Sequence, residues 1–519
     1  MRQKLLQKGT SILLSAAMAV SMIPAAPVLA APGGLTEPEI KASDFANVPM
    51  TYRPGVRWWW PGGAAKTEDL VKQVEYLVEN GFGAVESNPF NNGLYSDWAK
   101  EDLANILNYD NEEYYTKLKA VVDKADEAGI TVDLNMGSGY CAADDSVQPE
   151  DTMGNMGLGR STITVGADAV GKAQECEVPK VEVSALYFTE LNSFAYQYCE
   201  PDGLEATWHD GAETLQAVIV SKIDSKEGDK IVGAGGGFGG SVAEKDRILN
   251  FYDPKTKEVT KSYDKQYILD PENTFVIPVS ELKENKASFT PKVAGEYEVI
   301  GLYNEDSCSI GITALHYNKE KRDFVVDHLD PEAVANYVNG WIAGTKEYPS
   351  DLQTITDAYK DSDTLRAAFN DSYEFHNDNF YNDKVFAEAS KENNILGYDF
   401  TKYLPIMYNI GSANFNLGTV VEPDDVSGTN ADREKITYRT TENNPVTYKL
   451  TDDEIARITY DYHQLVDQAF QKGMESFSAT LKKYGLVYRQ QAYNPPIDTL
   501  KSSKYVDIPE TEGLDEMQL

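Results

Sequence analysis

The stretch that decides the fold of this chain is RWWWPGG, residues 57–63. Side chains of a β-strand alternate between its two faces, so Trp58 and Trp60 should share one environment while Trp59 has the other. The Pro-Gly-Gly that follows ends the strand in a turn. We expect a strand over 56–60 with one functional face. The alternative is that the rings all pack between a sheet and its helices.

Short apolar strands and amphipathic helices alternate along the chain after this strand. A helix is predicted over 67–80, a strand over 82–86, a helix over 114–128 and a strand over 130–136. This alternation indicates parallel strands joined by right-handed crossovers. It predicts a doubly wound sheet or a barrel.

The alternation stops at residue 161 and resumes after residue 315. In between, short strands and turns rich in Gly, Pro, Asn and Asp are typical of an inserted β-sandwich-like domain, for which an architectural role is favoured over sugar binding. Afterwards strands are predicted over 324–329, 365–369, 486–493 and 505–508, and helices over 331–343, 383–393 and 452–484. The α/β series then has about seven strands. The predicted fold class is α/β, a (β/α)8 TIM-like barrel that is incomplete by one strand.

The predicted organisation has five parts. They are a signal peptide over 1–30, a lead-in over 31–54, the first part of the catalytic barrel over 55–160, the inserted domain over 161–315, and the second part of the barrel over 316–519, truncated before closure. The signal peptide rests on basic Arg2, Lys4 and Lys8, an apolar stretch over 12–23 and a cleavage position after Ala30. We expect a secreted or cell-surface protein without a membrane span.

Composition narrows the class of ligand. A formal net charge of −36 opposes binding to nucleic acid and to anionic membranes. The 32 tyrosines favour carbohydrate, because aromatic rings stack on the apolar faces of sugars. Four cysteines are too few for a disulfide scaffold and match no zinc pattern. Free thiols are favoured over a bridge between Cys176 and Cys199.

In a barrel of this kind the catalytic groups lie at the carboxyl ends of the strands. The side chains there are mainly carboxylates, amides and aromatics. The candidate substrate contacts are Arg57, Trp59, Trp60, Glu86, Asn135, Tyr140, Asp327, His328, Asp371, Tyr373, Gln491 and Tyr493. There is no Ser-His-Asp order, no metal-binding histidine spacing and no lysine suited to a Schiff base. The set therefore predicts acid/base chemistry on a hydroxylated substrate.

Glycoside cleavage needs one carboxylic acid to protonate the leaving oxygen and a second carboxylate that attacks or activates water. Glu374 follows one strand, and Glu510 and Glu512 follow another, so these are the candidate catalytic residues. The alternative for each is a solvated or salt-bridged loop position.

Two features of the sequence bear on cofactors, a pair of aspartates and a glycine-rich run. Asp144 and Asp145 either line the pocket or bind a cation, but no calcium-loop pattern surrounds them, so a surface role is favoured and the metal ligands stay unassigned. The glycine run over 233–240 contains G-x-G-x-x-G inside the β-rich block instead of a βαβ unit. No organic cofactor is predicted.

Six sets of motifs, in order, resemble glycoside hydrolase family 106, the α-L-rhamnosidase family. They are RWWWPGG (57–63), GSGY with PED (137–140, 149–151), DSYE (371–374), GYD with YLP (397–399, 403–405), QQAY (490–493) and DIPETE (507–512). The resemblance implies a (β/α)8 barrel interrupted by inserted β structure, an inverting mechanism, and calcium as a candidate cofactor. By motif position it implies Glu374 as general acid and Glu512 as general base, with Glu510 as the second candidate for the base.

The implied substrate is a carbohydrate, a terminal α-L-rhamnose or related deoxy-sugar on plant-type polysaccharides or glycosides. The alternatives are a carbohydrate-binding protein without catalysis and an inactive truncated fragment of such an enzyme. Members of the family are longer, with an eighth strand and C-terminal β domains, whereas this chain ends seven residues after Glu512. We expect missing C-terminal domains or a partner chain to complete the barrel.

Overall fold

The computed structural model describes residue 43 and residues 48–89, 103–106, 109–180, 213–228, 249–252, 259–263, 265–306, 323–344, 351–373, 380–410, 446–492 and 497–510. The chain forms two compact units, Met1–Tyr52 and Arg53–Leu519. The described part of the first unit contains the 3-10 turn Met50–Tyr52. The elements below belong to the second unit. The predicted signal peptide lies outside the described residues.

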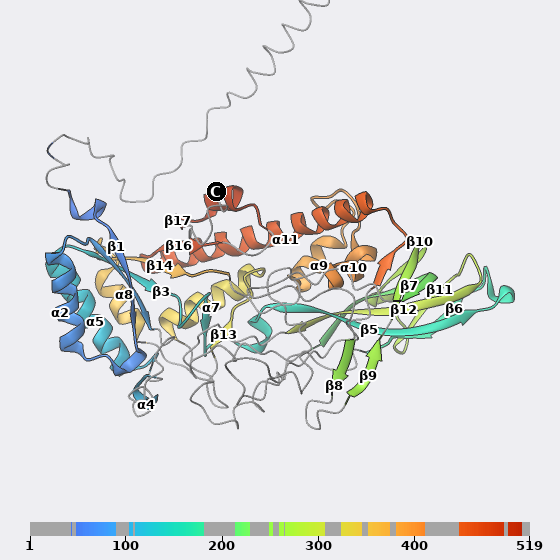
Figure 1. Cartoon of the computed structure of the whole chain (residues 1–519), viewed down its shortest axis with the longest axis horizontal. Coiled ribbons are helices and arrows are strands. Elements are labelled where there is room, and N and C mark those ends of the chain that lie inside the picture. Colours follow the sequence, from blue (N-terminus) through green and yellow to red (C-terminus); the bar gives the residue numbers. More distant parts are fainter. Residues whose placement is uncertain are drawn as a thin grey trace, which may run out of the picture. The chain divides into compact units, whose positions relative to one another are not determined.

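Six parallel strands form the main sheet. In spatial order they are β1 (Gly55–Trp60), β2 (Ala84–Pro89), β3 (Thr131–Asn135), β14 (Leu365–Asn370), β16 (Val487–Gln491) and β17 (Ile508–Glu510) (Figure 1). The spatial order follows the chain order, as it does in a (β/α)8 barrel. The predicted α/β class is confirmed, and the incomplete (β/α)8 TIM-like barrel stays a prediction.

This sheet is strongly curled. Its two outer strands, β1 and β17, would lie about 24 Å apart if six strands were flat, at about 4.8 Å per step. Arg57 of β1 nevertheless contacts Glu510 of β17, with 3.2 Å between Nη2 and Oε1. Two side chains of this length reach each other only when the sheet bends round toward itself. The face that carries them is the inner face of a partial barrel.

Helices cover the outer face of the sheet. The main ones are α2 (Thr67–Glu79), α5 (Glu112–Ala128), α7 (Pro331–Ala343), α8 (Leu352–Tyr359) and α11 (Asp452–Leu481) (Figure 1). Shorter helices are α4 (Leu103–Ile106), α9 (Asp383–Ala389), α10 (Leu404–Ile410) and α12 (Thr499–Ser502). Among the residues that the structure describes, no helix combines the length and hydropathy that a bilayer span requires.

The long helices begin and end at local sequence signals. Asn111 caps α5 by accepting a hydrogen bond from the Tyr114 amide, and Gly129 ends this helix with a φ of 72°. Thr451 and Glu454 form a capping box at the start of α11. These side chains satisfy amides that a helix leaves without partners in its first turn. The predicted helices over 114–128, 331–343 and 452–484 are therefore found close to their predicted places.

The prediction that residues 324–329 form a strand of the main sheet was wrong. Only Phe324–Val325 is extended, as β13, and it pairs antiparallel with β4 (Ala143–Asp144) instead of joining the main sheet. The loop after β3 folds back through a bridge between Gly137 and Ala143, which presents a backbone edge to β13. The described main sheet thus has six strands, and the fourth strand of the predicted series is not one of them.

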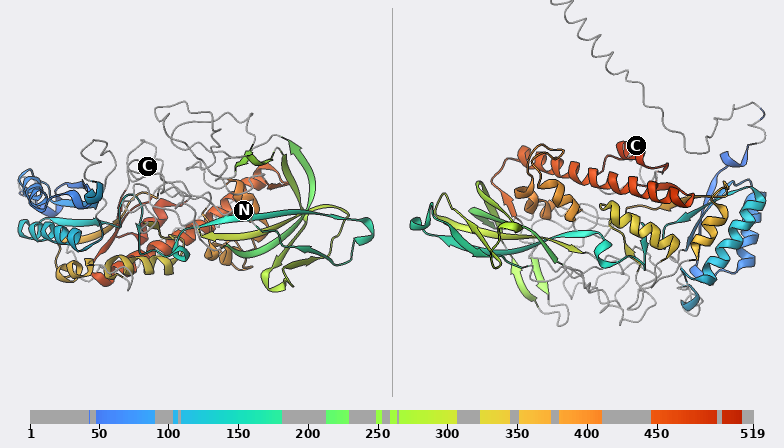
Figure 2. Two further views of the ribbon diagram at one scale, coloured as in Figure 1. Left: turned by 90° about the horizontal axis from the view of Figure 1, so that it is seen from below. Right: turned by 180° about the vertical axis from the view of Figure 1, so that it is seen from behind.

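The β-rich region forms its own sheets. Five strands lie in the order β15 (Val446–Tyr448), β10 (Lys265–Pro278), β7 (Glu213–Gly228), β12 (Gly295–Asp306) and β5 (Gly154–Val165). Two-stranded sheets are formed by β11 (Lys286–Phe289) with β6 (Gln174–Glu177) and by β8 (Leu249–Tyr252) with β9 (Val259–Tyr263). Figure 2 shows these long strands as a group set apart from the parallel sheet.

A hydrophobic core joins the five-stranded sheet to the β11–β6 pair. It includes Val218 and Tyr297 from the larger sheet and Cys176 and Phe289 from the smaller one. The two sheets thus share one core, and the predicted β-sandwich-like inserted domain stays a prediction. Strand β15 was not expected here, because it comes from residues far beyond 161–315 and pairs parallel with β10. Cys141 and Cys176 are both buried.

The turn after β3 depends on Gly137. Its φ is +82°, and an added Cβ would lie 1.8 Å from the Ala143 carbonyl oxygen. The Asn135 side-chain amide donates to the carbonyls of Gly137 and Gly139, each at 3.1 Å. The turn therefore fixes an amide at the carboxyl end of β3.

Replacing Gly137 by alanine should lower the melting temperature much more than Gly171→Ala. Gly171 has a similar φ of +76°, but no atom lies near the added Cβ. Alanine there should therefore lower the free energy of unfolding only by the cost of the left-handed conformation, about 1 kcal/mol. Gly137→Ala adds a clash with backbone. Thermal melts followed by circular dichroism check this difference. Equal losses for the two variants would show that the turn relaxes freely.

Candidate active site

The inner face of the sheet is defined by the strand register. Arg57 lies beside Glu86, Glu86 beside Asp133, and Phe369 beside Arg489. Since side chains alternate, every second residue shares this face. The inner-face residues are Arg57, Trp59, Glu86, Asn88, Asp133, Asn135, Phe369, Arg489, Gln491 and Glu510.

Arg57 joins three carboxylates from three parts of the chain. Its Nε lies 3.3 Å from Glu86 Oε1, its Nη1 lies 3.5 Å from Asp371 Oδ2, and its Nη2 donates to Glu510 Oε1 at 3.2 Å. Glu86 is on β2, Asp371 directly follows β14, and Glu510 ends β17. One guanidinium thus connects strands from both sides of the curled sheet.

Arg489 of β16 makes a second set of contacts with the same carboxylates. Its Nη1 lies 2.7 Å from Glu86 Oε2, and its Nε donates to Glu510 Oε2 at 2.7 Å. Both guanidiniums also lie over the ring of Phe369, with Cζ at 4.9 Å for Arg57 and 4.4 Å for Arg489. Cation–π attraction and ion pairing together allow the two like charges to sit close together.

Asp133 adds a fourth carboxylate to this arginine network. Its Oδ1 accepts from Arg366 Nε at 2.9 Å, and its Oδ2 accepts from Arg366 Nη2 at 2.6 Å and from Arg489 Nη1 at 3.1 Å. The network therefore contains four carboxylates and three guanidiniums. Paired charges fill the space that apolar layers occupy in many barrels.

Glu86 is a carboxyl group of the network whose pKa is shifted toward neutral pH. Burial raises its pKa to about 7, while Arg489 and Arg57 act in the lowering direction and Asp371 and Glu510 in the raising direction. Its contacts with the arginines are close ion pairs that lack the alignment of hydrogen bonds. A buried carboxyl group that titrates near neutral pH is suited to proton transfer.

Polar groups without partners surround the network near the carboxyl ends of the strands. Within the described part of the chain, both polar atoms of Asn88, Oδ1 of Asn135 and Oε1 of Gln491 are buried without a hydrogen bond. Trp59, on the same face, is 46% exposed. Because buried polar atoms are nearly always hydrogen-bonded, these atoms mark a place that suits the hydroxyl groups of a ligand.

Trp60 lies on the other face. Its ring is 2% exposed, stacks on Trp58 at 5.4 Å between centroids, and packs against Tyr114 of α5 at 5.6 Å. Trp58 donates to Gln73 of α2 at 2.8 Å. The expected split between Trp58 and Trp60 on one side and Trp59 on the other is confirmed. The position of Trp60 favours core packing over the predicted substrate contact.

His328 and Tyr373 also lie on the helix side, in a buried polar cluster. His328 Nε2 is 3.0 Å from Asn370 Nδ2, and the Tyr373 hydroxyl donates to Gln490 Oε1 at 2.8 Å. Burial lowers the pKa of His328 to about 4, so the ring is neutral at physiological pH. These contacts brace β14 against β16. They favour a structural role, and the predicted substrate contacts stay predictions.

Asp327 is equally buried. It accepts from Asn382 Nδ2 at 2.5 Å and from the Leu329 amide at 2.8 Å. Burial raises its pKa to about 8, which the two hydrogen bonds oppose. Asp327 therefore joins the start of α7 to the start of α9.

Four predicted site residues remain, and three of them lie in segments that the structure does not describe. Tyr140 is half-buried in the loop after β3. Glu374, Glu512 and Tyr493 lie outside the described residues. Among the three candidate catalytic glutamates, the structure therefore places only Glu510.

Four members of the network were not predicted from the sequence. They are Asp133, Arg366, Phe369 and Arg489. The available signal was strand alternation, because Asp133 and Arg489 each stand two positions before a predicted inner-face amide, Asn135 and Gln491. The predicted site contained only residues at the carboxyl ends of the strands. Asp133, Phe369 and Arg489 lie one layer deeper in the barrel.

Comparison with solved structures finds a likeness in fold. No family model matches the sequence, and no curated protein does. The structure is similar to that of a rhamnosidase from Novosphingobium sp. PP1Y, with a TM-score of 0.55 and 15% sequence identity. The match covers 90% of this chain and 48% of that chain, so this chain spans about half the length of that protein. The fold is therefore rhamnosidase-like, and membership of family 106 stays a prediction.

The raised pKa of Glu86 predicts a pH-dependent effect on stability. The folded protein holds this proton up to about pH 7, whereas the model value for glutamate is 4.5. Ionisation of Glu86 therefore costs stability as pH rises through this window, up to about 3 kcal/mol. Glu86→Gln removes that cost, so its melting temperature relative to wild type should rise between pH 4.5 and pH 8.

Glu68→Gln is the matched control, since Glu68 is exposed on α2. Its difference from wild type should stay constant over the same range. A constant difference for Glu86→Gln would mean that the Glu86 carboxyl is ionised throughout.

Proposed function

We propose that this protein is an exported glycoside hydrolase that removes terminal α-L-rhamnose, or a related deoxy-sugar, from plant-type polysaccharides or glycosides. One observation carries the proposal. Arg57 contacts both Asp371 and Glu510, which stand three residues before Glu374 and two residues before Glu512. A single side chain therefore draws together the two segments that lead into the proposed acid and base.

The proposed reaction uses these two glutamates in different roles. Glu374 protonates the glycosidic oxygen as the bond to the anomeric carbon breaks, and Glu512 takes a proton from the water that attacks the opposite face. The product sugar then has inverted configuration. Glu510 is shared by Arg57 and Arg489, so it is better suited to orienting the site than to activating water. This contact supports Glu512 over Glu510 as the base.

The surroundings of the network suit a deoxy-sugar. Trp59 presents an exposed ring on the inner face, and such rings stack on the apolar face of a pyranose. The nearby amides of Asn88, Asn135 and Gln491 offer donors and acceptors for hydroxyl groups. The likeness to a rhamnosidase favours rhamnose among the sugars that fit this description.

The acid role of Glu374 is tested with 4-nitrophenyl α-L-rhamnoside. Wild type should release nitrophenol and form β-L-rhamnose first, as seen by NMR. Glu374→Gln should lower kcat about 10²- to 10⁴-fold. Glu392→Gln, at an exposed position, should leave kcat unchanged.

Equal activity of wild type and Glu374→Gln would exclude Glu374 as the acid. Calorimetry that shows rhamnose binding by a folded wild type without any turnover would instead support the non-catalytic carbohydrate-binding alternative.

Substitutions of Trp59 and Trp60 should have different effects, the first on substrate binding and the second on stability. Trp59→Ala removes an exposed inner-face ring, so KM should rise while the melting temperature changes little. Trp60→Ala opens a cavity between the sheet and α5, which should cost about 3–5 kcal/mol. Kinetics and thermal melts of both variants check this. An unchanged KM for Trp59→Ala would place the sugar elsewhere.

A further inference from the structure

A closed ring of four hydrogen bonds lies on the helix side of the main sheet. The Val326 carbonyl accepts from His328 Nδ1 at 2.7 Å, and Asn370 Nδ2 donates to His328 Nε2 at 3.0 Å. Asn370 Oδ1 accepts from the Ala142 amide at 2.8 Å, and the Ala142 carbonyl accepts from the Val326 amide at 3.2 Å. His328 and Asn370 are each at most 1% exposed, so bulk water does not compete for these bonds.

Backbone groups fix the direction of each bond in this ring. The Val326 carbonyl can only accept, so His328 Nδ1 carries the proton and Nε2 of the neutral imidazole is an acceptor. The Ala142 amide can only donate, so Asn370 Oδ1 faces it and Asn370 Nδ2 faces His328. His328 therefore holds the Asn370 amide in one orientation.

Asn370 stands at the end of β14 between two residues that contact the arginine network. Arg57 and Arg489 lie over the ring of Phe369, and the Asp371 carboxylate lies 3.5 Å from Arg57 Nη1. Neighbouring residues of a strand point to opposite faces, so an amide fixed on the helix side also fixes the side chains on either side of it. The ring thus reaches the network through the backbone of β14.

The same amide also holds β16. Gln490 Oε1 accepts from Asn370 Nδ2 at 3.3 Å, and Gln490 Nε2 donates to the Asp371 carbonyl at 3.5 Å. Gln490 stands between Arg489 and Gln491, which both belong to the inner face. The inner-face residues of two strands therefore depend on the orientation of Asn370.

Helix α11 keeps His328 in place. A Cβ added to Gly473 would lie 2.0 Å from the His328 carbonyl oxygen, so the helix packs directly on this backbone. The centroid of the Phe477 ring lies 5.3 Å from that of the imidazole, and the centroid of Tyr373 lies at 5.1 Å. Packing on the helix side therefore sets the position of the imidazole.

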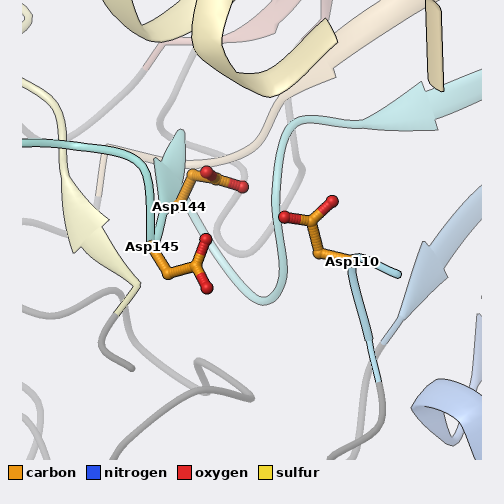
Figure 3. Close-up of side chains that lie close together, drawn as sticks. All are labelled: Asp110, Asp144 and Asp145. Atoms are coloured by element: carbon orange, nitrogen blue, oxygen red, sulfur yellow. The ribbon is translucent and has the colours of Figure 1, made fainter. Parts of the chain in front are cut away.

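The loop that supplies Ala142 is held separately at its other end. It continues into Asp144 and Asp145, whose buried side chains turn with Asp110 toward a common space (Figure 3). This burial corrects the surface role predicted for the two aspartates. One carboxylate oxygen from each of the three lies within 4.8 Å of the others, and such a group could hold the calcium ion that the family resemblance implies. The hydrogen-bonded ring contains none of these carboxylates.

We propose that His328 is a positioning residue, which acts through Asn370 to hold Phe369 and Asp371 where the arginine network of the active site needs them. Its effect on catalysis rests on the proposed hydrolysis. Without the Nε2 acceptor, the Asn370 amide loses its fixed orientation and the end of β14 shifts. Such a shift lowers the rate of bond cleavage more than the affinity for substrate.

Kinetics with 4-nitrophenyl α-L-rhamnoside separate positioning from stability. His328→Leu should lower kcat about 100-fold with little change in KM, the loss expected when a catalytic group moves by about 1 Å. His328→Gln can place an amide oxygen near the position of Nε2, so it should recover most of the lost activity. Phe477→Leu is the matched control, because it removes packing against the imidazole but no hydrogen bond. It should lower the melting temperature and leave kcat unchanged.

Three kinetic results would overturn the proposal. They are an unchanged kcat in His328→Leu, a kcat in His328→Gln as low as in His328→Leu, and an equal loss of kcat in Phe477→Leu. If His328→Leu fails to fold, Asn370→Ala takes its place, since it removes the other side chain of the ring.

A second measurement needs no turnover. Asp371→Asn removes the charge that faces Arg57, and the resulting loss in melting temperature should be smaller in the His328→Leu background than in wild type, because coupled positions are not additive. Equal losses in the two backgrounds would overturn the positioning role. A folded wild type that never cleaves the rhamnoside contradicts the proposed hydrolysis instead, and this comparison then decides the role of His328.

Discussion

The contact between Arg57 and the carboxylates of Glu86, Asp371 and Glu510 is the constraint on which the rest of the barrel portion depends. It requires the first and last strands of the sheet to approach, so it fixes the curl. Buried ion pairs are costly to desolvate, and removing one partner of such a pair costs about 3–5 kcal/mol because the other charge stays buried. The network therefore specifies one geometry more strongly than an apolar interior would. That geometry is what a site built from several strand ends needs.

The two faces of the main sheet carry different kinds of side chains. On the outer face, Trp58 and Trp60 pack against α2 and α5, and a buried polar cluster that includes His328 holds β14 and β16 to the helices. On the inner face, charged groups and amides surround an exposed ring. Strand alternation allows this division, because neighbouring residues point in opposite directions. Rigid packing behind the sheet thus supports a polar surface in front of it, as a preorganised active site requires.

Much of the secondary structure could be predicted from local signals. Asn111, Gly129 and the Thr451–Glu454 capping box mark helix ends through bonds within one turn, so they act without tertiary help. The strand expected at 324–329 failed because its pairing partner, β4, comes from a distant loop. Arg489 and Asp133 were overlooked for the same reason. Their significance depends on carboxylates and guanidiniums that lie hundreds of residues away in the sequence.

The sequence by itself determined which residues alternate, where the helices begin and end, and that the strands run parallel, because these depend on neighbouring residues and on chain chirality. It also established that RWWWPGG splits its rings between two faces. Only the tertiary structure decided which face is inner, since that depends on the direction in which the sheet curls and on where the helices pack. It alone brought Arg57 to Glu510 across the sheet and Asp110 to Asp144 between two loops. Such contacts arise from burial and charge balance over the whole fold, which no local pattern encodes.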